Sequence, residues 1–317
     1  MSPKSRLGAG WRANRTSRRS SDRIRRRIIG ESCVVSSVGV IGVGVIGKPI
    51  AERLLDAGFR VLVYDVRSEP VQALQRRGAH ACASSAEVAE ATEIIISLVM
   101  DTPQTDDVVS GPRGIVHTIK PGTLFATGST LGPAPVIRIA ETLAAKGCDT
   151  LDMPITGGYL AASVGKLALM VGGTRETLDR AAPVLQAFSH VITHAGAIGA
   201  GQAAKVAHQL IMGVNIIGLL EGLSLGVAGG VQPDVLKKIV KDGIANSTVL
   251  EMWEDLGPRW KGMLAPTAPD TPLPNLRKDL HTALQLAREL NVNLYLGTQA
   301  SLVADAGAAT GHDNPAL

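Results

Sequence analysis

The segment from residue 38 to residue 65 constrains the fold of this chain more than any other. It opens with a short apolar strand at residues 38–41, followed at once by the run Gly42-Val43-Gly44-Val45-Ile46-Gly47. Apolar residues at helical spacing come next, Gly58 ends that helix, and a second apolar strand ends in Asp65. A strand, a G-x-G-x-x-G turn, a helix, a strand and an acid in this order predict a βαβ unit that binds a dinucleotide.

Each part of this motif has a physical task at the cofactor. Gly42 allows the tight turn, Gly44 lets the backbone approach a pyrophosphate, and Gly47 permits close packing of helix on strand, while the helix N-terminus offers its N–H groups to phosphate. Asp65 can accept hydrogen bonds from ribose hydroxyls and would repel a 2′-phosphate, so NAD is favoured. Arg67, beyond Val66, could pair with that phosphate and keeps NADP possible. The alternative is a glycine-rich turn in another α/β protein, such as one that binds S-adenosylmethionine.

The alternation of strands and helices continues to about residue 198 and then stops. Further strands are expected at residues 93–100, 122–126, 149–153 and 167–171, with helices at residues 71–77, 86–91 and 135–146. This order predicts an α/β fold with a doubly wound parallel sheet of the Rossmann type. We therefore expect a dinucleotide-binding domain at residues 38–198. A long interdomain helix and an all-helical C-terminal domain are expected at residues 199–317.

Residues 210–231 form an apolar run of 22 residues that is long enough to span a bilayer. Glu221 lies at its middle, where an ionisable group is costly in lipid, and six glycines weaken a lipid-exposed helix. We expect a buried helix of a soluble protein instead, and no membrane partner. Gly218, Gly222 and Gly226 recur every four residues, so a helix of this chain or of a partner subunit can approach that face closely. A homo-oligomer is therefore expected.

The charge of the chain is concentrated at its N-terminus. The net charge is +4 and the sequence pI about 9.0, which would suggest an anionic partner such as nucleic acid. Residues 1–37 contain ten Lys and Arg and two acids, so this segment has a charge of +8 and the remainder −4. A transit peptide, a nucleic-acid arm and a disordered extension without a role all fit it. We expect the disordered extension, no nucleic-acid partner and a cytoplasmic protein, or a mitochondrial one if the segment is a transit peptide.

The three cysteines, Cys33, Cys82 and Cys148, are far apart in the sequence. Their odd number and wide spacing exclude a disulfide scaffold and a zinc cage built from cysteines, and they fit a reducing compartment. No pair of the seven histidines falls at ligand spacing on a helix except in passing. No metal site is expected.

Four further segments follow the dinucleotide motif. They are Ser129-Thr130-Leu131-Gly132-Pro133, Asp152-Met153-Pro154-Ile155-Thr156-Gly157-Gly158, Gly199-Ala200-Gly201-Gln202-Ala203-Ala204-Lys205 and Lys278-Asp279-Leu280. With the dinucleotide motif, this series resembles the β-hydroxyacid dehydrogenase family, which includes 3-hydroxyisobutyrate dehydrogenases and tartronate semialdehyde reductases. The resemblance covers roughly residues 38–315. It implies hydride transfer between nicotinamide and a small anionic 3-hydroxy acid or its semialdehyde.

The resemblance also implies roles for single residues. Lys205 would be the catalytic general acid and base, and its apolar helix favours this because burial disfavours a charged lysine. Without the resemblance, a lysine of this kind reads as a solvated side chain. The substrate would meet Ser129 and the turn Thr156-Gly157-Gly158, whose N–H groups can hold a carboxylate. The cofactor would meet the remaining positions, which are Leu98, Val99, Met100, Thr130 and Lys278.

The chain departs from the family pattern at three places. His208 and Gln209 occupy substrate-binding positions where the family commonly has two asparagines that contact substrate or orient the lysine. Thr156 replaces a common serine, and Gly128 precedes Ser129 where an acid is frequent. These changes leave the reaction class intact but put the substrate in doubt. Two alternatives are an imine-reductase-like enzyme and a non-catalytic cofactor-binding protein with a nucleic-acid-binding arm. The presence of Lys205 counts against both.

Overall fold

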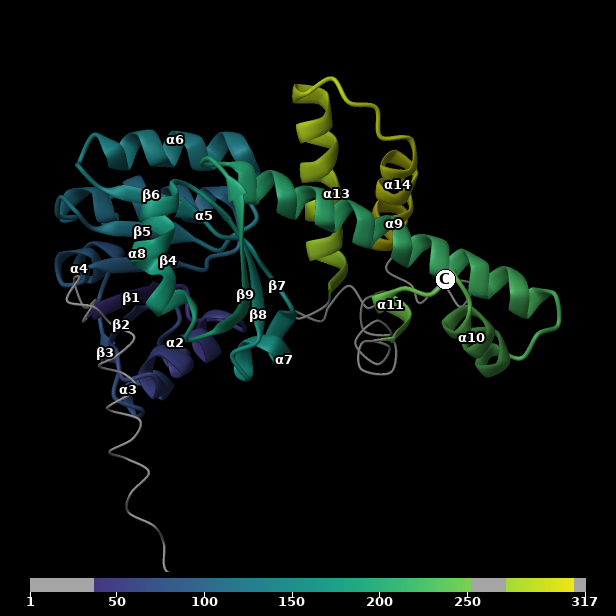
Figure 1. Cartoon of the computed structure of the whole chain (residues 1–317), viewed down its shortest axis with the longest axis horizontal. Coiled ribbons are helices and arrows are strands. Elements are labelled where there is room, and N and C mark those ends of the chain that lie inside the picture. Colours follow the sequence, from purple (N-terminus) through teal and green to yellow (C-terminus); the bar gives the residue numbers. More distant parts are fainter. Residues whose placement is uncertain (1–36, 252–271, 311–317) are drawn as a thin grey trace, which may run out of the picture. The chain divides into compact units, whose positions relative to one another are not determined.

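The computed structural model describes residues 37–251 and 272–310 (Figure 1). The expected basic extension covers residues 1–37. All of it except Ser37, which begins the first strand, lies outside the described residues. Strands and helices alternate up to Gly196, and every element from Ala200 onward is helical. The predicted fold class is confirmed, because a Rossmann-type sheet is followed by helices alone in the described residues.

The sheet has the strand order β3-β2-β1-β4-β5-β6-β8-β7, with β9 paired to β8. The pairs from β3 to β6 are parallel, as are β8 and β9, whereas β8 runs antiparallel to both β6 and β7. The strands are β1 Ser37–Ile41, β2 Arg60–Tyr64, β3 His80–Ala81, β4 Ile94–Ser97, β5 Leu124–Thr127, β6 Asp149–Asp152, β7 Ile155–Thr156, β8 Leu167–Gly172 and β9 Ser189–Gly196.

Helices connect these strands and cover the sheet. They are α2 Gly47–Asp56, α3 Ser68–Gln75, α4 Ser85–Glu90, α5 Thr102–Ser110, η1 Ile115–His117, α6 Pro133–Ala144, α7 Gly158–Ser163 and α8 Arg175–Leu185. On one face, Leu62, Ile95 and Phe125 of three strands share a core with Val88 of α4 and Ile139 of α6. Because these strands are parallel, their carboxyl ends lie at the same edge of the sheet. Ligands bind at that edge in open α/β sheets.

The helical part consists of α9 Ala200–Ala228, α10 Pro233–Asp242, α11 Thr248–Glu251, α13 Pro272–Glu289 and α14 Tyr295–Thr310. Ile216 of α9 forms a core with Leu276 and Leu280 of α13 and with Ala300 of α14. Gly213 makes this packing possible, because a Cβ there would lie 2.9 Å from Leu280 Cδ2. Because Gly213 has no side chain, α13 can pack directly against the middle of α9.

The helix α9 is buried over its first half and open over its second. Its buried residues run from Gly201 to Ile216, and only 11% of its most apolar 18-residue window is buried. By length and composition alone α9 could cross a membrane. Within the described part of the chain, nothing lies within 4 Å of a Cβ placed at Gly218 or Gly222. Leu236 of α10 approaches Gly226, so the second half of α9 is covered only in part within the described residues, and the expectation of a buried helix fails around Gly218 and Gly222.

Candidate active site

The glycine-rich turn after β1 has no space for side chains at two of its three glycines. Gly42 has a φ of +86°, and a Cβ there would lie 2.9 Å from the Leu98 carbonyl group. At Gly47 a Cβ would come within 1.9 Å of Gly42 O, so α2 can start only at a glycine. The third glycine, Gly44, lies in the bend itself, and Gly42 N–H donates to Tyr64 O at 2.9 Å. The turn therefore presents backbone at the start of α2, as a dinucleotide pyrophosphate requires.

Two backbone N–H groups fix the Asp65 carboxylate at the end of β2. Its Oδ2 accepts the N–H of Val43 at 2.9 Å, and its Oδ1 accepts the N–H of Arg67 at 2.9 Å. The Arg67 Nε lies 3.3 Å from the same Oδ1. A Cβ on Gly44 would meet Arg67 Nη2 at 2.9 Å, so this guanidinium covers the turn. One buried carboxylate and one exposed cation therefore lie together at the end of β2, where the former would suit a ribose hydroxyl and the latter a phosphate.

The other predicted cofactor residues surround this turn with apolar surface. Val45, Val66 and Met100 are exposed large apolar side chains at the loops that follow β1, β2 and β4. Leu98 lies against Gly42 and Gly47, and Val99 packs partly into the core. A dinucleotide fits this arrangement, because the glycines leave room for phosphate and the acid at the end of β2 can receive the ribose.

The start of α9 is anchored to the sheet by a fully buried acid. Asp152, the last residue of β6, accepts the N–H of Gly199 at 2.7 Å through Oδ1 and that of Gln202 at 2.6 Å through Oδ2. Burial raises the pKa of Asp152, and these hydrogen bonds oppose the rise. Gly201 is needed here, since a Cβ would lie 2.4 Å from Met170 O and 2.7 Å from Asp152 Oδ2. Asp152 thus fixes the helix that carries Lys205.

Gln202 joins the same helix to the loop after β5. Its Oε1 accepts the N–H groups of Leu131 and Gly132 at 2.9 and 3.2 Å, and its Nε2 donates to Ser129 O at 2.8 Å. The Ser129 hydroxyl donates to Val99 O. Asp152 and Gln202 belong to segments that carry the family resemblance, but the sequence alone indicates no role for either residue. Their signal was weak, because a buried acid or amide that binds only backbone has no motif of its own.

Lys205 lies in the buried part of α9 and takes part in a series of polar contacts. Only 7% of Lys205 is exposed, and its Nζ donates to Gln209 Oε1 at 2.9 Å. Gln209 Nε2 donates to Asp279 Oδ2 of α13. Lys278 Nζ lies 3.0 Å from Asp279 Oδ1 and donates to Thr130 O at 3.2 Å. The structure therefore brings together two predicted lysines, Thr130 and Gln209, through an acid that had no predicted role.

Burial changes the proton affinity of the two titratable groups on this face of α9. It lowers the pKa of Lys205 to about 8, an effect that Asp279 opposes and Lys278 reinforces. Burial also lowers the pKa of His208, and the positive charge of Lys205 lowers it further. A lysine whose pKa is near neutrality can both give and take a proton at a useful rate. The lowered pKa of Lys205 is therefore of the kind that suits a lysine acting as general acid and base.

The predicted substrate turn lies beside the same helix. The Thr156 hydroxyl and His208 Nε2 are 3.4 Å apart. Gly157 and Gly158 follow with φ angles of +119° and +64°, and a Cβ on Gly157 would lie 2.6 Å from Ala161 Cβ. Both glycines are therefore required by the turn itself, whatever it binds. The contact with His208 places the turn one helical turn from Lys205 along α9.

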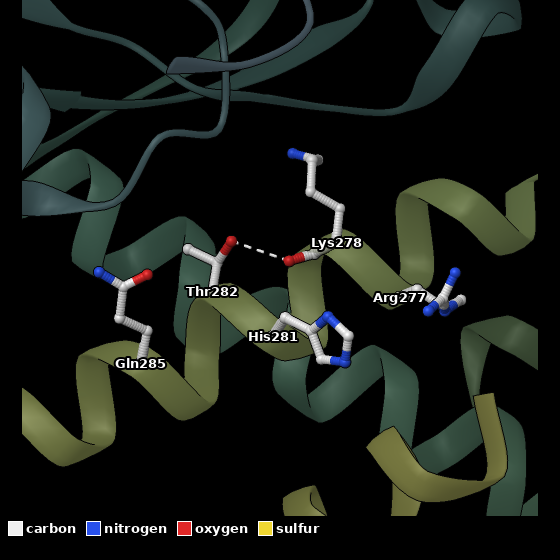
Figure 2. A pocket seen from close by; sticks show the side chains of 5 residues that line it. All are labelled: Arg277, Lys278, His281, Thr282 and Gln285. Atoms are coloured by element: carbon white, nitrogen blue, oxygen red, sulfur yellow. Dashed lines mark hydrogen bonds between the residues drawn. The ribbon is translucent and has the colours of Figure 1, made fainter. Parts of the chain in front are cut away.

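Lys278 also borders an open pocket on α13. Figure 2 shows its side chain extending away from this helix, while Arg277, His281, Thr282 and Gln285 line the rest of the pocket. The Thr282 hydroxyl donates to Lys278 O at 2.8 Å. One flank of Lys278 thus faces solvent and the other contacts the buried carboxylate of Asp279.

Comparison with known proteins agrees with this geometry. Residues 37–196 match a sequence family described as the NAD-binding domain of 6-phosphogluconate dehydrogenase. Residues 199–316 match one described as NAD-binding of NADP-dependent 3-hydroxyisobutyrate dehydrogenase. The chain belongs to the β-hydroxyacid dehydrogenase family. As a β-hydroxyacid dehydrogenase, it is an NAD(P)-dependent oxidoreductase that acts on CH–OH groups.

Members of the β-hydroxyacid dehydrogenase family match nearly the whole described chain. The 2-(hydroxymethyl)glutarate dehydrogenase of Eubacterium barkeri is 32% identical over 274 residues, which are 86% of this chain and 90% of that protein. The crystal structure of a 3-hydroxyisobutyrate dehydrogenase from Salmonella typhimurium has a TM-score of 0.77 at 28% identity and covers 87% of this chain and 95% of its own. A variant imine reductase from Myxococcus stipitatus is 20% identical with a TM-score of 0.62, which shows a shared fold alone.

Proposed function

We propose that this β-hydroxyacid dehydrogenase interconverts a small 3-hydroxy acid and its semialdehyde, with Lys205 as the proton donor and acceptor. The observation that carries this proposal is the buried amine of Lys205, whose pKa is lowered to about 8 and whose acceptor is Gln209. An oxidoreductase of this kind needs a group that moves one proton while the cofactor moves a hydride.

Lys205 would act in both directions of the reaction. When bound, the nicotinamide supplies or receives the hydride. In the reducing direction, protonated Lys205 gives its proton to the substrate carbonyl oxygen. In the oxidising direction, neutral Lys205 takes the proton of the substrate hydroxyl. Gln209 holds the amine in position, and Asp279 holds Gln209.

The substrate proposal rests on the turn beside α9. The N–H groups of Thr156, Gly157 and Gly158 would hold a carboxylate, and the Ser129 hydroxyl would contact the same ligand. His208 lies within reach of Thr156 and would decide which substituents the pocket admits. The relative from Eubacterium barkeri is named for a hydroxymethyl diacid, and the structural neighbour from Salmonella typhimurium for 3-hydroxyisobutyrate. Both names describe short hydroxy acids, which fit this arrangement.

NAD remains the cofactor that we favour. The Asp65 carboxylate is held by two backbone N–H groups at the end of β2, so its charge stays where a 2′-phosphate would lie. Arg67 is exposed and would have to leave Asp65 to bind that phosphate. The cost of separating this pair disfavours NADP, although NADP stays possible.

A homo-oligomer is also part of the proposal. The open half of α9 exposes Leu225 and Val227, and α10 exposes Val235 and Ile239. Such apolar surface favours association with a second copy. Sedimentation of the full chain should show a dimer or larger species, and a monomer would contradict this part. The cytoplasmic location, and the lack of membrane and nucleic-acid partners, rest on the sequence alone.

The reaction itself is tested by a panel of substrates. Short 3-hydroxy acids should reduce NAD, and their semialdehydes should oxidise NADH, as followed by the absorbance of the reduced nicotinamide. Cyclic imines provide the matched comparison, because they test the imine-reductase alternative with the same cofactor. Turnover of hydroxy acids without turnover of imines is expected. Turnover of imines alone would contradict the proposal.

A further inference from the structure

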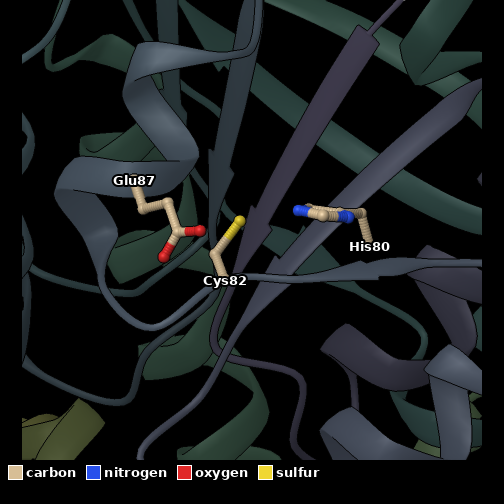
Figure 3. A group of neighbouring side chains, drawn as sticks. All are labelled: His80, Cys82 and Glu87. Carbon is tan, nitrogen blue, oxygen red and sulfur yellow. The ribbon is translucent and has the colours of Figure 1, made fainter.

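A second group of reactive side chains lies at the edge of the sheet, on elements other than those that carry Lys205. His80 belongs to the edge strand β3, Cys82 follows that strand, and Glu87 lies in α4. One ligand atom from each lies within 4.8 Å of the other two. Figure 3 shows the Cys82 thiol between the Glu87 carboxylate and the His80 imidazole. Because His80 and Cys82 are two residues apart on extended backbone, their side chains share one face.

The backbone fixes two of these three side chains. The Cys82 N–H donates to Val63 O of β2 at 2.9 Å, which holds the thiol at the end of the edge strand. The Ala83 N–H donates to Glu87 Oε2 at 2.6 Å, and the Glu87 N–H donates to Ser84 Oγ at 3.2 Å. These reciprocal bonds aim the carboxylate back toward Cys82. The exposed His80 can turn toward both.

The charges of the group favour a cation. Burial and the negative charge of Glu87 together raise the pKa of Cys82 to about 11, while Arg60 acts in the opposite direction. A thiolate and a carboxylate at this separation repel one another unless a cation lies between them. The exposed Arg60 of β2 is the nearby cation that acts on the thiol, but it supplies no ligand atom to a metal.

We infer that His80, Cys82 and Glu87 form a binding site for one zinc ion. Zn²⁺ takes nitrogen, sulfur and carboxylate oxygen ligands in a tetrahedron, and three protein ligands leave the fourth position for water. A thiolate among the ligands disfavours Mg²⁺ and Ca²⁺, which prefer oxygen alone. On binding, the Zn–S bond replaces the S–H bond, and the thiol proton passes to solvent.

This site was not expected from the sequence, since His-x-Cys followed by a glutamate five residues later resembles no common zinc motif. The fold creates it, because the start of α4 returns the chain beside the end of β3. The site is also next to the cofactor region. Val63, which holds Cys82, lies two residues before Asp65 in the sequence.

The test is a metal titration of the full chain after treatment with a chelator. Zn²⁺ is added in competition with a chromogenic chelator, and Co²⁺ is used as a spectroscopic probe because a thiolate ligand gives it a charge-transfer band. We expect one equivalent of Zn²⁺ per chain and a cobalt–thiolate band. Cys82→Ser should abolish the band. His80→Ala and Glu87→Gln should each weaken binding by on the order of tenfold or more.

Matched controls make the result specific to this group. Cys148→Ser removes another buried cysteine and should leave both the stoichiometry and the band unchanged. Cys33→Ser serves the same purpose for the cysteine of the N-terminal segment. Glu87→Gln keeps an oxygen for the Ala83 N–H, and His80 is exposed, so both variants should fold even if Cys82→Ser does not. Absence of zinc binding by the wild-type chain, or equal binding by the His80 and Glu87 variants, would overturn the inference.

Discussion

The amine of Lys205 and the carboxylate of Asp279 are joined by the side-chain amide of Gln209. The amide oxygen accepts from Lys205 Nζ at 2.9 Å, and the amide nitrogen donates to Asp279 Oδ2. All three side chains are buried. Gln209 stands where asparagine is common in the β-hydroxyacid dehydrogenases, and its additional methylene lets it contact α9 and α13 together. Asp279 is therefore a positioning residue for Lys205, through both its charge and the bridging amide.

Asp279→Asn should move the pH dependence of turnover toward acid. Asp279 raises the pKa of Lys205, so removing its charge should lower that pKa further below about 8. Hydroxy acid oxidation needs neutral Lys205, so its rise with increasing pH should occur at a lower pH than in wild type. Semialdehyde reduction needs protonated Lys205, so its loss with increasing pH should also occur at a lower pH than in wild type. A weaker base should also slow oxidation at its plateau, by on the order of tenfold. Profiles of kcat in both directions measure the change.

Asp305→Asn is the matched control for this change. Asp305 is an acid of α14 that pairs with Arg277 and His281 of the helix that carries Asp279. Its loss should alter the packing of α13 and α14 without moving either profile. An unchanged pH profile of kcat for Asp279→Asn, or an equal shift for both variants, would contradict a positioning role for Asp279.

Asp65→Asn should relax the discrimination between the two cofactors. The variant keeps an oxygen for the Val43 N–H, so the turn should persist while the negative charge is lost. Because a like charge beside a phosphate costs several kcal/mol, the ratio of kcat/KM for NAD and NADP should shift toward NADP by on the order of tenfold or more. Arg67→Ala should move the same ratio in the opposite direction. A wild-type preference for NADP would contradict the role given to Asp65.

The sequence was sufficient for the parts of the fold that depend on local patterns. The glycine turn, the acid at residue 65 and the apolar strands at residues 93–100 and 149–153 all have periodic or motif signals. Strand β3 has two residues and β9 alternates weakly, so neither could be recognised. The helices α5 and α8 were also missed, although each is capped by a side chain, from Asp101 and Thr174.

The candidate site was harder to predict, because its residues meet through tertiary contacts. Motifs identified Lys205 and Lys278, which the family resemblance placed in order along the chain. Asp279 adjoins Lys278 in the same motif, but nothing local in the sequence indicates that it reaches Gln209 on another helix. Asp152 and Gln202 bind backbone groups 47 to 73 residues away in sequence. Such partners cannot be derived from spacing.

Gly201→Ala should destabilise the fold. A Cβ at this position would lie 2.4 Å from Met170 O, which is backbone and cannot move aside easily. Inserting a methyl group into a packed site costs about 1–3 kcal/mol. Denaturation by urea should show this loss in the free energy of unfolding, with kcat falling as α9 shifts against Asp152. Stability equal to wild type would contradict the close approach of α9 to β8.

The most direct test of the account is the turnover of Lys205→Ala compared with its affinity for NADH. Loss of the proton donor and acceptor should lower kcat by on the order of 10²–10⁴-fold. NADH binding, measured by fluorescence titration, should stay at the wild-type value, and a small primary amine added to the solution should restore part of the activity. Lys241→Ala, an exposed lysine of α10, should match wild type in both measurements. Wild-type turnover by Lys205→Ala would contradict the account.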